Sequence, residues 1–281
     1  MNAWSQRLSR VAVMASSLVL GMATMDVSAQ SIVSTGQSFI SARLLPGQTG
    51  EDGSRLAGLR LTMTPGWKTY WRAPGRAGIP PRFDWSGSDN VASVEVLWPR
   101  PLVFESFGMR TVGYEEEVLL PLRVTPERLG EDMRLTLSAE LGVCRDICVL
   151  EEVAVEEAIP ADLRSIGYRE ISRAMRRIPV QAAEVGVAME GCRITGSQGS
   201  WTLEAEIASD RFAETPEILV EGSERLWVFE SSTQASGNTV LVTAELQVPA
   251  GTSWIDRSVL RFTVLGADYA ADIQGCSASA G

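Results

Sequence analysis

The chain has 281 residues and a net charge of −10, and it contains four cysteines and no histidine. An acidic chain does not suit nucleic acid or anionic lipid, because Lys and Arg supply the affinity for phosphate. A thiolate pair without histidine does not complete a tetrahedral zinc shell, so we expect no metal and no cofactor. Proteins and small neutral ligands remain as partners.

The N-terminus has the pattern of a signal peptide spanning residues 1–29. Arg7 and Arg10 precede an apolar run over residues 11–25, and Val27, Ser28 and Ala29 supply small residues before a cleavage point at Gln30. No later segment approaches the roughly 20 apolar residues of a membrane helix, so we expect no membrane anchor after cleavage. An exported chain with an even cysteine count is expected to form disulfides.

Residues 30–160 are expected to form a first domain. Strand-like alternations occur over residues 39–45, 55–64, 91–98 and 118–124 and in a cysteine-containing segment, with Pro and Gly clusters between them. Short strands separated in this way predict an antiparallel β-sandwich.

Cys144 and Cys148 lie where one alternating pattern ends and the next begins, which predicts a hairpin with residues 145–147 at its tip. Directly opposed residues on antiparallel strands have Cα atoms about 4.5 to 5.5 Å apart, which suits a disulfide. A disulfide that closes so short a loop stabilises the fold by only about 2 kcal/mol in the loop-closure model. Because stabilisation is then a weak reason for the bond, redox chemistry is the favoured interpretation. A structural disulfide or two unpaired thiols is the alternative.

The periodicity changes over residues 161–177, which predicts an amphipathic helix that ends before Pro179. Its apolar positions are Leu163, Ile166, Ile171, Ala174, Met175 and Ile178. We expect residues 161–180 to connect the first domain to a second β-sandwich over residues 181–281. The strands expected there are residues 201–207, 217–221, 226–230, 239–248 and 259–264.

Cys192 and Cys276 lie near the two ends of the second domain. Their spacing carries no exchange signature, and a bond between them would close a long loop, so we expect a structural disulfide. Two free thiols are the alternative. The predicted pairing is therefore Cys144 with Cys148 and Cys192 with Cys276.

Five segments of the first domain follow a known order. They are GWKTYWRAPG (66–75), GIPP (78–81), WPRP (98–101), GYEEEVLLP (113–121) and VCRDIC (143–148). In this order they resemble the N-terminal periplasmic domain of the DsbD and ScsB thiol:disulfide interchange proteins. The resemblance covers residues 30–160 and is closest to the ScsB type, in which a further sandwich domain follows.

The resemblance implies an all-β fold of two immunoglobulin-like antiparallel β-sandwich domains joined by a short helical connector. It implies a periplasmic protein-disulfide reductase, with a link to cytochrome c-type biogenesis. Cys144 and Cys148 match the pair that accepts electrons from a membrane-embedded donor and passes them to thioredoxin-like proteins. In this family an aromatic cap loop shields the cysteines; residues 104–109 match it, with Phe104 and Phe107 as its aromatic residues and Phe107 as the expected shield.

No segment of the sequence resembles the membrane-spanning electron carrier or the C-terminal thioredoxin domain of the full-length family, so we expect the reductant to act in trans. A non-enzymatic periplasmic binding or assembly protein with two structural disulfides is the alternative function.

Two groups of side chains near the cysteines complete these expectations. The aromatic residues Trp67, Tyr70, Trp71, Trp85 and Trp98 are expected to pack in the core. The carboxylates of Asp146, Glu151 and Glu152 disfavour a thiolate unless Arg145 or a docked partner offsets them.

Overall fold

The structure is a computed structural model that describes residues 38–106, 108–161, 168–197, 200–223 and 225–276. The predicted signal peptide, residues 1–29, and the predicted shield Phe107 lie outside the described residues. Within these ranges, no helix has the length and apolar character needed to cross a membrane.

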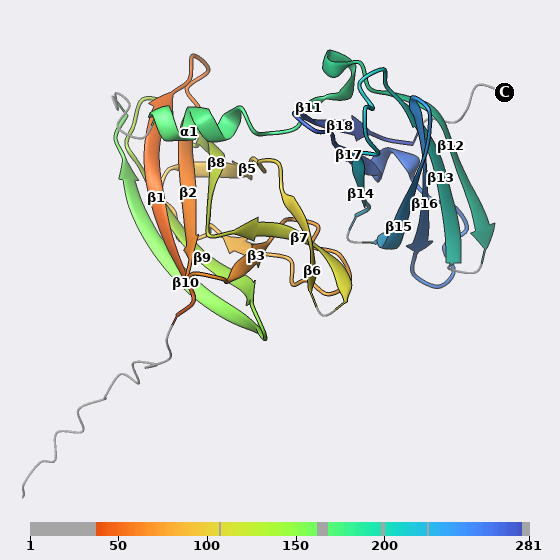
Figure 1. Ribbon diagram of the computed structural model, residues 1–281. Coiled ribbons are helices and arrows are strands. Elements are labelled where there is room, and N and C mark those ends of the chain that lie inside the picture. The colour runs from red at the N-terminus through yellow and green to blue at the C-terminus, as the bar shows by residue number, and fades with distance from the viewer. Residues whose placement is uncertain (1–37, 107, 162–167, 198–199, 224, 277–281) are drawn as a thin grey trace, which may run out of the picture. The chain divides into compact units, whose positions relative to one another are not determined.

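Two sheets form the first sandwich (Figure 1). The four strands of one sheet, in spatial order, are β1 (Ile40–Thr49), β2 (Arg55–Met63), β8 (Glu117–Pro126) and β5 (Val91–Val96). The order of the other sheet is β10 (Cys148–Ile159), β9 (Met133–Cys144), β3 (Lys68–Tyr70), β7 (Met109–Glu115) and β6 (Leu102–Ser106), and β4 (Arg82–Asp84) also pairs with β9. All their pairings are antiparallel, as predicted.

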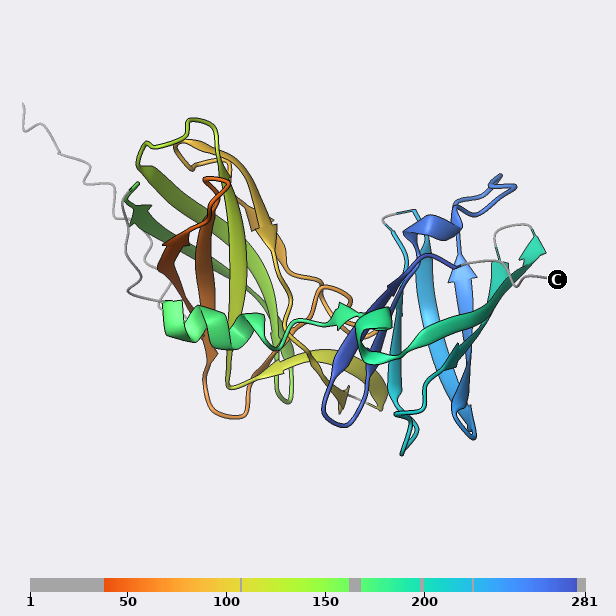
Figure 2. The ribbon, with the colours of Figure 1, turned by 90° about the horizontal axis from the view of Figure 1, so that it is seen from above.

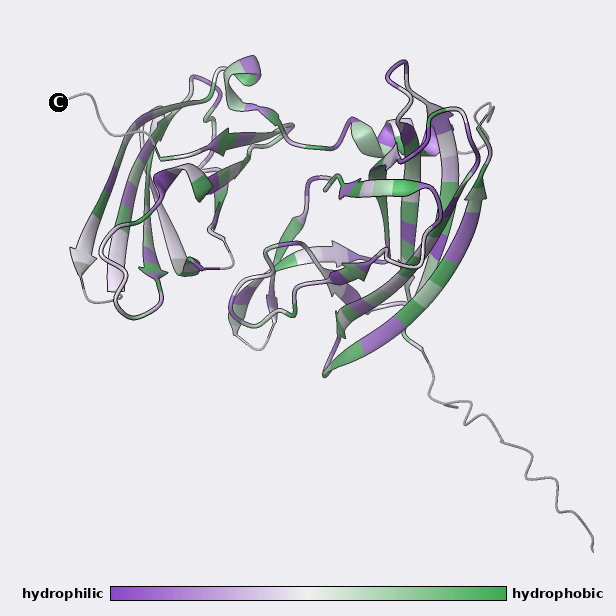
Figure 3. Ribbon diagram, turned by 180° about the vertical axis from the view of Figure 1, so that it is seen from behind, coloured by the Kyte–Doolittle hydropathy of each residue, from purple (hydrophilic) through white to green (hydrophobic). Residues whose placement is uncertain are grey.

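The alternation of apolar and polar residues places the first core between these sheets. Leu135, Leu137 and Leu141 of β9 are fully buried, whereas Arg134 and Ser138 on its other face are exposed. Figure 3 shows the same alternation of hydrophobic and hydrophilic residues along the long strands. Trp67 and Trp71 belong to this core and Trp85 and Trp98 pack against it, so the expectation for these four aromatic residues is confirmed.

Helix α1 (Tyr168–Met175) packs on β1, β2 and β8 of the first sandwich (Figures 1 and 2). Ile171 is fully buried, and a Cβ atom at Gly58 of β2 would lie 3.2 Å from Ile171 Cγ1. The absence of a side chain at Gly58 therefore lets the helix approach the sheet closely. The helix lies within the predicted connector and ends four residues before Pro179; residues 162–167 of its predicted first part lie outside the described ranges.

Two further sheets form the second sandwich around a separate apolar core. Their strand orders are β11 (Val180–Gln181), β18 (Ala270–Gln274), β17 (Arg261–Leu265) and β14 (Glu217–Glu221), and β12 (Ala188–Ser197), β13 (Ser200–Ala208), β16 (Thr239–Gln247) and β15 (Trp227–Ser236). Short 3₁₀ helices span Ala182–Val185 and Arg257–Val259. The two-residue β11 pairs with β18 in parallel, which differs from the predicted antiparallel arrangement. Strand β11 follows the connector and not a hairpin turn, so no preceding strand of the same sheet fixes its direction as antiparallel.

A disulfide joins Cys192 to Cys276, which are separated by 84 positions in sequence and have Cα atoms 5.4 Å apart. Cys192 lies in β12 and Cys276 lies just after β18, so the bond connects the two sheets of the second sandwich. Both residues are buried in the second core. The pairing is as predicted, and its structural role stays a prediction.

Several short strands were not predicted, and most of them lie between residues 68 and 115. These are β3, β4, β6 and β7 in the first sandwich and β11, β12 and β18 in the second. The boundaries 30–160, 161–180 and 181–281 stay predictions; the strands of the first sandwich run from residue 40 to residue 159 and those of the second from residue 180 to residue 274.

Candidate functional site

The β9–β10 hairpin brings Cys144 and Cys148 together at its tip. The two strands pair without a break from Met133 and Ile159 to the two cysteines, which are directly opposed. Residues 145–147 form the turn, where the Arg145 amide donates to the Ile147 carbonyl at 3.0 Å. The cysteines are disulfide-bonded with Cα atoms 4.2 Å apart, so the predicted hairpin and bond are both present.

The two sulfur-bearing residues differ in accessibility. Cys144 is 2% exposed, whereas Cys148 lies on the edge strand β10 and is exposed. Ile147 and Leu150 on either side of Cys148 are 60% and 54% exposed. A thiol from solvent or from a docked protein therefore reaches Cys148 in an apolar setting and is kept from Cys144.

The burial of Cys144 needs an explanation, because this residue lies on the outer face of its strand. Val143 points into the core, so Cys144 and Gly142 point away from it. Tyr70 of β3 covers this outer face: its hydroxyl oxygen lies 2.6 Å from Cys144 Sγ and 3.3 Å from Cys148 Sγ. Disulfide sulfurs carry no hydrogen, so the tyrosine donates. Burial raises the pKa of Tyr70, which keeps this donor protonated.

Two glycines make room for the Tyr70 ring. A Cβ atom at Gly142 would lie 2.8 Å from Tyr70 Cδ2 and 2.7 Å from Ile79 Cβ, and one at Gly78 would lie 2.9 Å from Tyr70 Cδ1. Gly142 thus lets the ring lie flat against β9, two residues before Cys144. Tyr70 was expected only in the core. No local sequence pattern could have placed it at the site, because β3 has only three residues.

Lys68 connects the disulfide strand to the predicted cap. It is the register partner of Cys144 across β3 and β9, so the two side chains share the outer face. Its ammonium lies 2.9 Å from Glu115 Oε1 and 4.1 Å from the centroid of the Phe104 ring. Phe104 is therefore held by a cation–π contact, next to the register partner of Cys144.

The predicted cap segment is a β-hairpin rather than an irregular loop. Strands β6 and β7 pair from Leu102 with Gly113 to Ser106 with Met109. Gly108, just before β7, has a φ of 72°, a left-handed conformation that glycine adopts without strain. Phe104 lies within β6, and Phe107 lies outside the described residues.

The charged groups near the cysteines are largely paired. Arg145 Nε donates to Asp146 Oδ2 at 2.8 Å, and its guanidinium lies 5.5 Å from the Trp67 ring centroid. Glu151 accepts hydrogen bonds from the Ser38 hydroxyl and the Phe39 amide at 2.8 and 3.1 Å, so its charge is directed toward the start of β1. Arg145 was expected to offset the negative charge of the nearby carboxylates, and it pairs in this way with Asp146.

Among the described residues, no group of three or more His, Cys, Asp or Glu side chains is placed to hold a metal ion. The chemistry available at the site is that of the two sulfurs and the phenol beside them.

Residues 41–160 match the family model described as thiol:disulfide interchange protein DsbD, N-terminal. The resemblance inferred from the sequence is thereby confirmed for this segment. The match includes both cysteines, Tyr70 and the β6–β7 hairpin.

A solved structure extends the likeness to the second sandwich. The crystal structure of the N-terminal periplasmic domain of ScsB from Proteus mirabilis matches with a TM-score of 0.64 and 21% sequence identity. The alignment covers 86% of this chain and 94% of that chain, so both sandwiches share its fold. The predicted all-β, immunoglobulin-like fold is confirmed. Among curated proteins, no match was found.

Proposed function

We propose that this chain is a periplasmic thiol:disulfide exchange module that reacts through Cys144 and Cys148. The observation that carries the proposal is the asymmetry of the pair at the hairpin tip: Cys148 is exposed, while Cys144 is buried beneath the Tyr70 hydroxyl. Thiol:disulfide exchange needs one sulfur that a partner thiolate can attack and a second sulfur that leaves as a thiolate and later attacks the mixed disulfide. The match of residues 41–160 to the DsbD N-terminal model supports the same chemistry.

Reduction of the pair begins when a donor thiolate attacks Cys148 Sγ, the accessible sulfur. A new bond forms between the donor sulfur and Cys148, the Cys144–Cys148 bond breaks, and its electron pair passes to Cys144 Sγ. Tyr70 donates a hydrogen bond to the Cys144 sulfur as its negative charge develops. A second donor thiolate then attacks the donor sulfur of this mixed disulfide and releases Cys148 as a thiolate, so two electrons have entered the pair.

Delivery of the electrons follows the same path in reverse. The Cys148 thiolate attacks the disulfide of an oxidised partner, and Cys144 then attacks Cys148 Sγ to release the partner in its reduced form. As part of the proposal, the acceptors are periplasmic thioredoxin-like proteins, and a membrane-embedded donor supplies electrons in trans. The overall activity is that of a protein-disulfide reductase, acting after export and removal of residues 1–29.

The exposed side chains beside Cys148 support a protein rather than a small molecule as the partner. Ile147 and Leu150 leave much of their apolar surface in water, which a docked protein would cover. Their position on both sides of the accessible cysteine would place that partner over the sulfur to be attacked.

Single-cysteine variants test the proposal. A thioredoxin-like protein with one active-site cysteine, activated as a mixed disulfide with 5-thio-2-nitrobenzoate, is mixed with each variant. Cys144→Ala, which leaves Cys148 free, is expected to form the covalent complex on the order of ten-fold faster than Cys148→Ala, because access controls exchange. Cys192→Ala with Cys276→Ala, analysed after reduction, serves as the control; it is expected to release 5-thio-2-nitrobenzoate as fast as Cys144→Ala but to accumulate no covalent complex, because Cys144 then displaces the partner. Complex formation by neither single variant favours the alternative of a non-enzymatic protein with two structural disulfides.

A further inference from the structure

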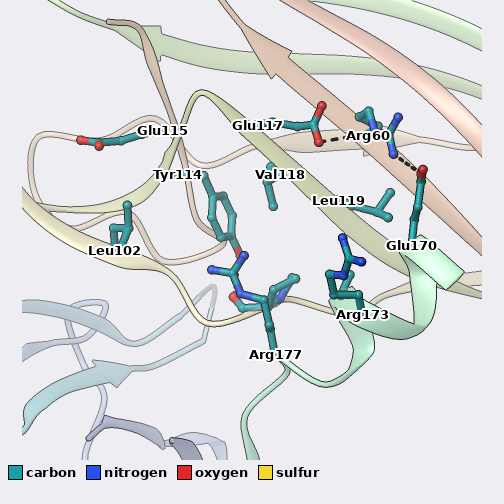
Figure 4. A pocket seen from close by; sticks show the side chains of 12 residues that line it. Arg60, Leu102, Tyr114, Glu115, Glu117, Val118, Leu119, Glu170, Arg173 and Arg177 are labelled. Atoms are coloured by element: carbon teal, nitrogen blue, oxygen red, sulfur yellow. Dashed lines mark hydrogen bonds and ion pairs between the residues drawn. The ribbon is translucent and has the colours of Figure 1, made fainter. Parts of the chain in front are cut away.

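A pocket of about 380 Å³ lies between α1 and the first sandwich, apart from the disulfide (Figure 4). Strands β2, β6, β7 and β8 line one side of it together with Pro99, and α1 and Arg177, two residues after the helix, line the other. A cavity of this size accommodates a small organic molecule.

The strand side of the pocket has an apolar part beside its charged residues. Leu102, Val118 and Leu119 line it together with Tyr114. The Tyr114 hydroxyl donates to the Pro99 carbonyl at 2.7 Å, so this polar group is already satisfied. What Tyr114 contributes to a ligand is therefore contact area, as an aromatic side chain does in most small-molecule sites.

Every carboxylate that lines the pocket already has a cation. Arg60 pairs with both Glu117 and Glu170, drawn as dashed lines in Figure 4. Glu115 pairs with Lys68 at 2.9 Å. These ion pairs reduce the repulsion that the carboxylates exert on an anion, although Glu117 and Glu170 share the single cation of Arg60.

Two lining arginines remain without such a partner. In the described part of the chain, neither Arg173 nor Arg177 has a carboxylate within ion-pair distance, and Figure 4 shows both guanidinium-bearing side chains at the pocket. Both line the α1 side of the pocket, Arg173 from the helix and Arg177 from the turn after it, so their like charges face the same space. A bound anion would relieve their repulsion and satisfy the planar donors of both groups.

We propose that this pocket binds the carboxylate of a small amphipathic anion. Arg173 and Arg177 donate to the carboxylate, and the apolar body of the ligand lies against Leu102, Val118 and the Tyr114 ring. The carboxylate belongs either to a free organic acid or to the C-terminus of a peptide. The acidic net charge of the chain does not exclude this ligand, because Arg173 and Arg177 place two positive charges on the α1 side of the pocket.

Titration of the full chain with benzoate, followed by amide chemical shifts, tests the proposal. Benzamide has the same shape without the charge and is the ligand control. We expect benzoate to saturate a single site near α1 and to bind about ten-fold or more tightly than benzamide, because a hydrogen bond to a charged group contributes about 1.5 to 3 kcal/mol. Equal affinity for the two compounds, or no saturable shifts with benzoate, would overturn the proposal.

Matched variants assign the site. Arg173→Gln with Arg177→Gln is expected to weaken benzoate binding about ten-fold or more through loss of the charged donors. Arg169→Gln with Arg176→Gln removes the same charge from exposed positions that do not line the pocket, and binding is expected to stay unchanged. Equal weakening by both pairs would show a general charge effect and contradict the assigned site. Ile171, which anchors α1, is retained in all variants.

Two peptides distinguish the sources of the carboxylate. Acetyl-Ala-Phe with a free C-terminus is compared with its C-terminal amide and with benzoate, all on the wild-type chain. Tighter binding of the free peptide than of benzoate identifies a peptide terminus, and the reverse order identifies a free organic acid. Either order supports the pocket, whereas binding of the amide as tightly as the free peptide contradicts it. None of these outcomes bears on the redox site.

Discussion

The Tyr70 hydroxyl lies 2.6 Å from Cys144 Sγ, on the outer face of a strand whose opposite face forms the core. The register places Tyr70 beside Gly142, so the ring covers the strand at a point where no side chain stands in the way. A sulfur that would otherwise face solvent is thereby buried next to a protonated hydrogen-bond donor. This relationship divides the pair into an accessible sulfur and a sheltered leaving group.

Tyr70→Phe keeps the ring and removes the donor. We expect reduction of Cys144–Cys148 by a small thiol to slow by about ten-fold, since a hydrogen bond to a charged group contributes about 1.5 to 3 kcal/mol. Burial raises the pKa of Tyr70, so its hydroxyl stays protonated to at least about pH 9. The ratio of the wild-type rate to the Tyr70→Phe rate is therefore expected to be constant between about pH 7 and pH 9. Stopped-flow measurement with a thiol reductant checks both; an unchanged rate contradicts the assigned role.

Gly142→Ala places a methyl group against the Tyr70 ring and Ile79. We expect a loss of about 1 to 3 kcal/mol in the free energy of unfolding, the usual cost of overpacking. Gly87→Ala is the matched control, because its added Cβ would meet only Thr136 Cγ2, at 3.1 Å. Urea denaturation gives the stability of both variants, of Tyr70→Ala, and of Gly142→Ala combined with Tyr70→Ala. The double variant compared with its two single variants gives the coupling energy between position 142 and the Tyr70 ring. Additive losses in the double variant would contradict the close contact of ring and glycine.

The two disulfides are expected to differ in their effect on stability. Cys192→Ala with Cys276→Ala is expected to destabilise the second sandwich by about 2 to 5 kcal/mol, because the bond closes a long loop and joins two sheets. Cys144→Ala with Cys148→Ala is expected to cost less, since its loop is short and β9 and β10 pair without it. Midpoints of denaturant unfolding compare the two, and the reverse order contradicts the structural role of Cys192–Cys276.

Phe107→Ala tests the cap. Phe107 follows Ser106, the last residue of β6, in the sequence, and Phe104 of β6 contacts Lys68, the register partner of Cys144. We expect the variant to speed reduction of Cys144–Cys148 by a small thiol, because access to the attacked sulfur is one determinant of the rate.

The control for the cap is Met109→Ala, which truncates an exposed residue of the β6–β7 hairpin and is expected to leave the rate unchanged. A loss of about 3 to 5 kcal/mol in stability for Phe107→Ala, without faster reduction, would identify Phe107 as a core residue instead.

The sequence was sufficient to predict the cysteine hairpin, because its alternation is local and long. Leu135 to Val143 on one side and Val153 and Val155 on the other set the register that opposes Cys144 and Cys148. Strand β14 was predicted with its observed bounds, Glu217–Glu221, from a short run of apolar β-forming residues between two glutamates. The second disulfide followed from the position of its cysteines at the two ends of a sandwich.

The rest of the site depends on contacts that are distant in sequence. Strand β3 has three residues, too few to show a period, yet it carries both Lys68 and Tyr70 to the sulfurs. Tyr70 and Cys144 are 74 residues apart, and only the sheet order β9, β3, β7 brings them together. The sequence around Gly142 was similarly insufficient. A glycine in a strand can indicate that another group packs closely against the backbone, but it does not identify that group as the Tyr70 ring.

The reduction potential of Cys144–Cys148 is the most direct test of whether this pair exchanges. The full chain is equilibrated in thiol buffers of defined potential, and the free thiols are alkylated and assigned by mass spectrometry. The account predicts a potential near or above about −230 mV for Cys144–Cys148 and one below about −300 mV for Cys192–Cys276. A value below about −300 mV for Cys144–Cys148 would show a permanent structural bond and contradict the exchange function.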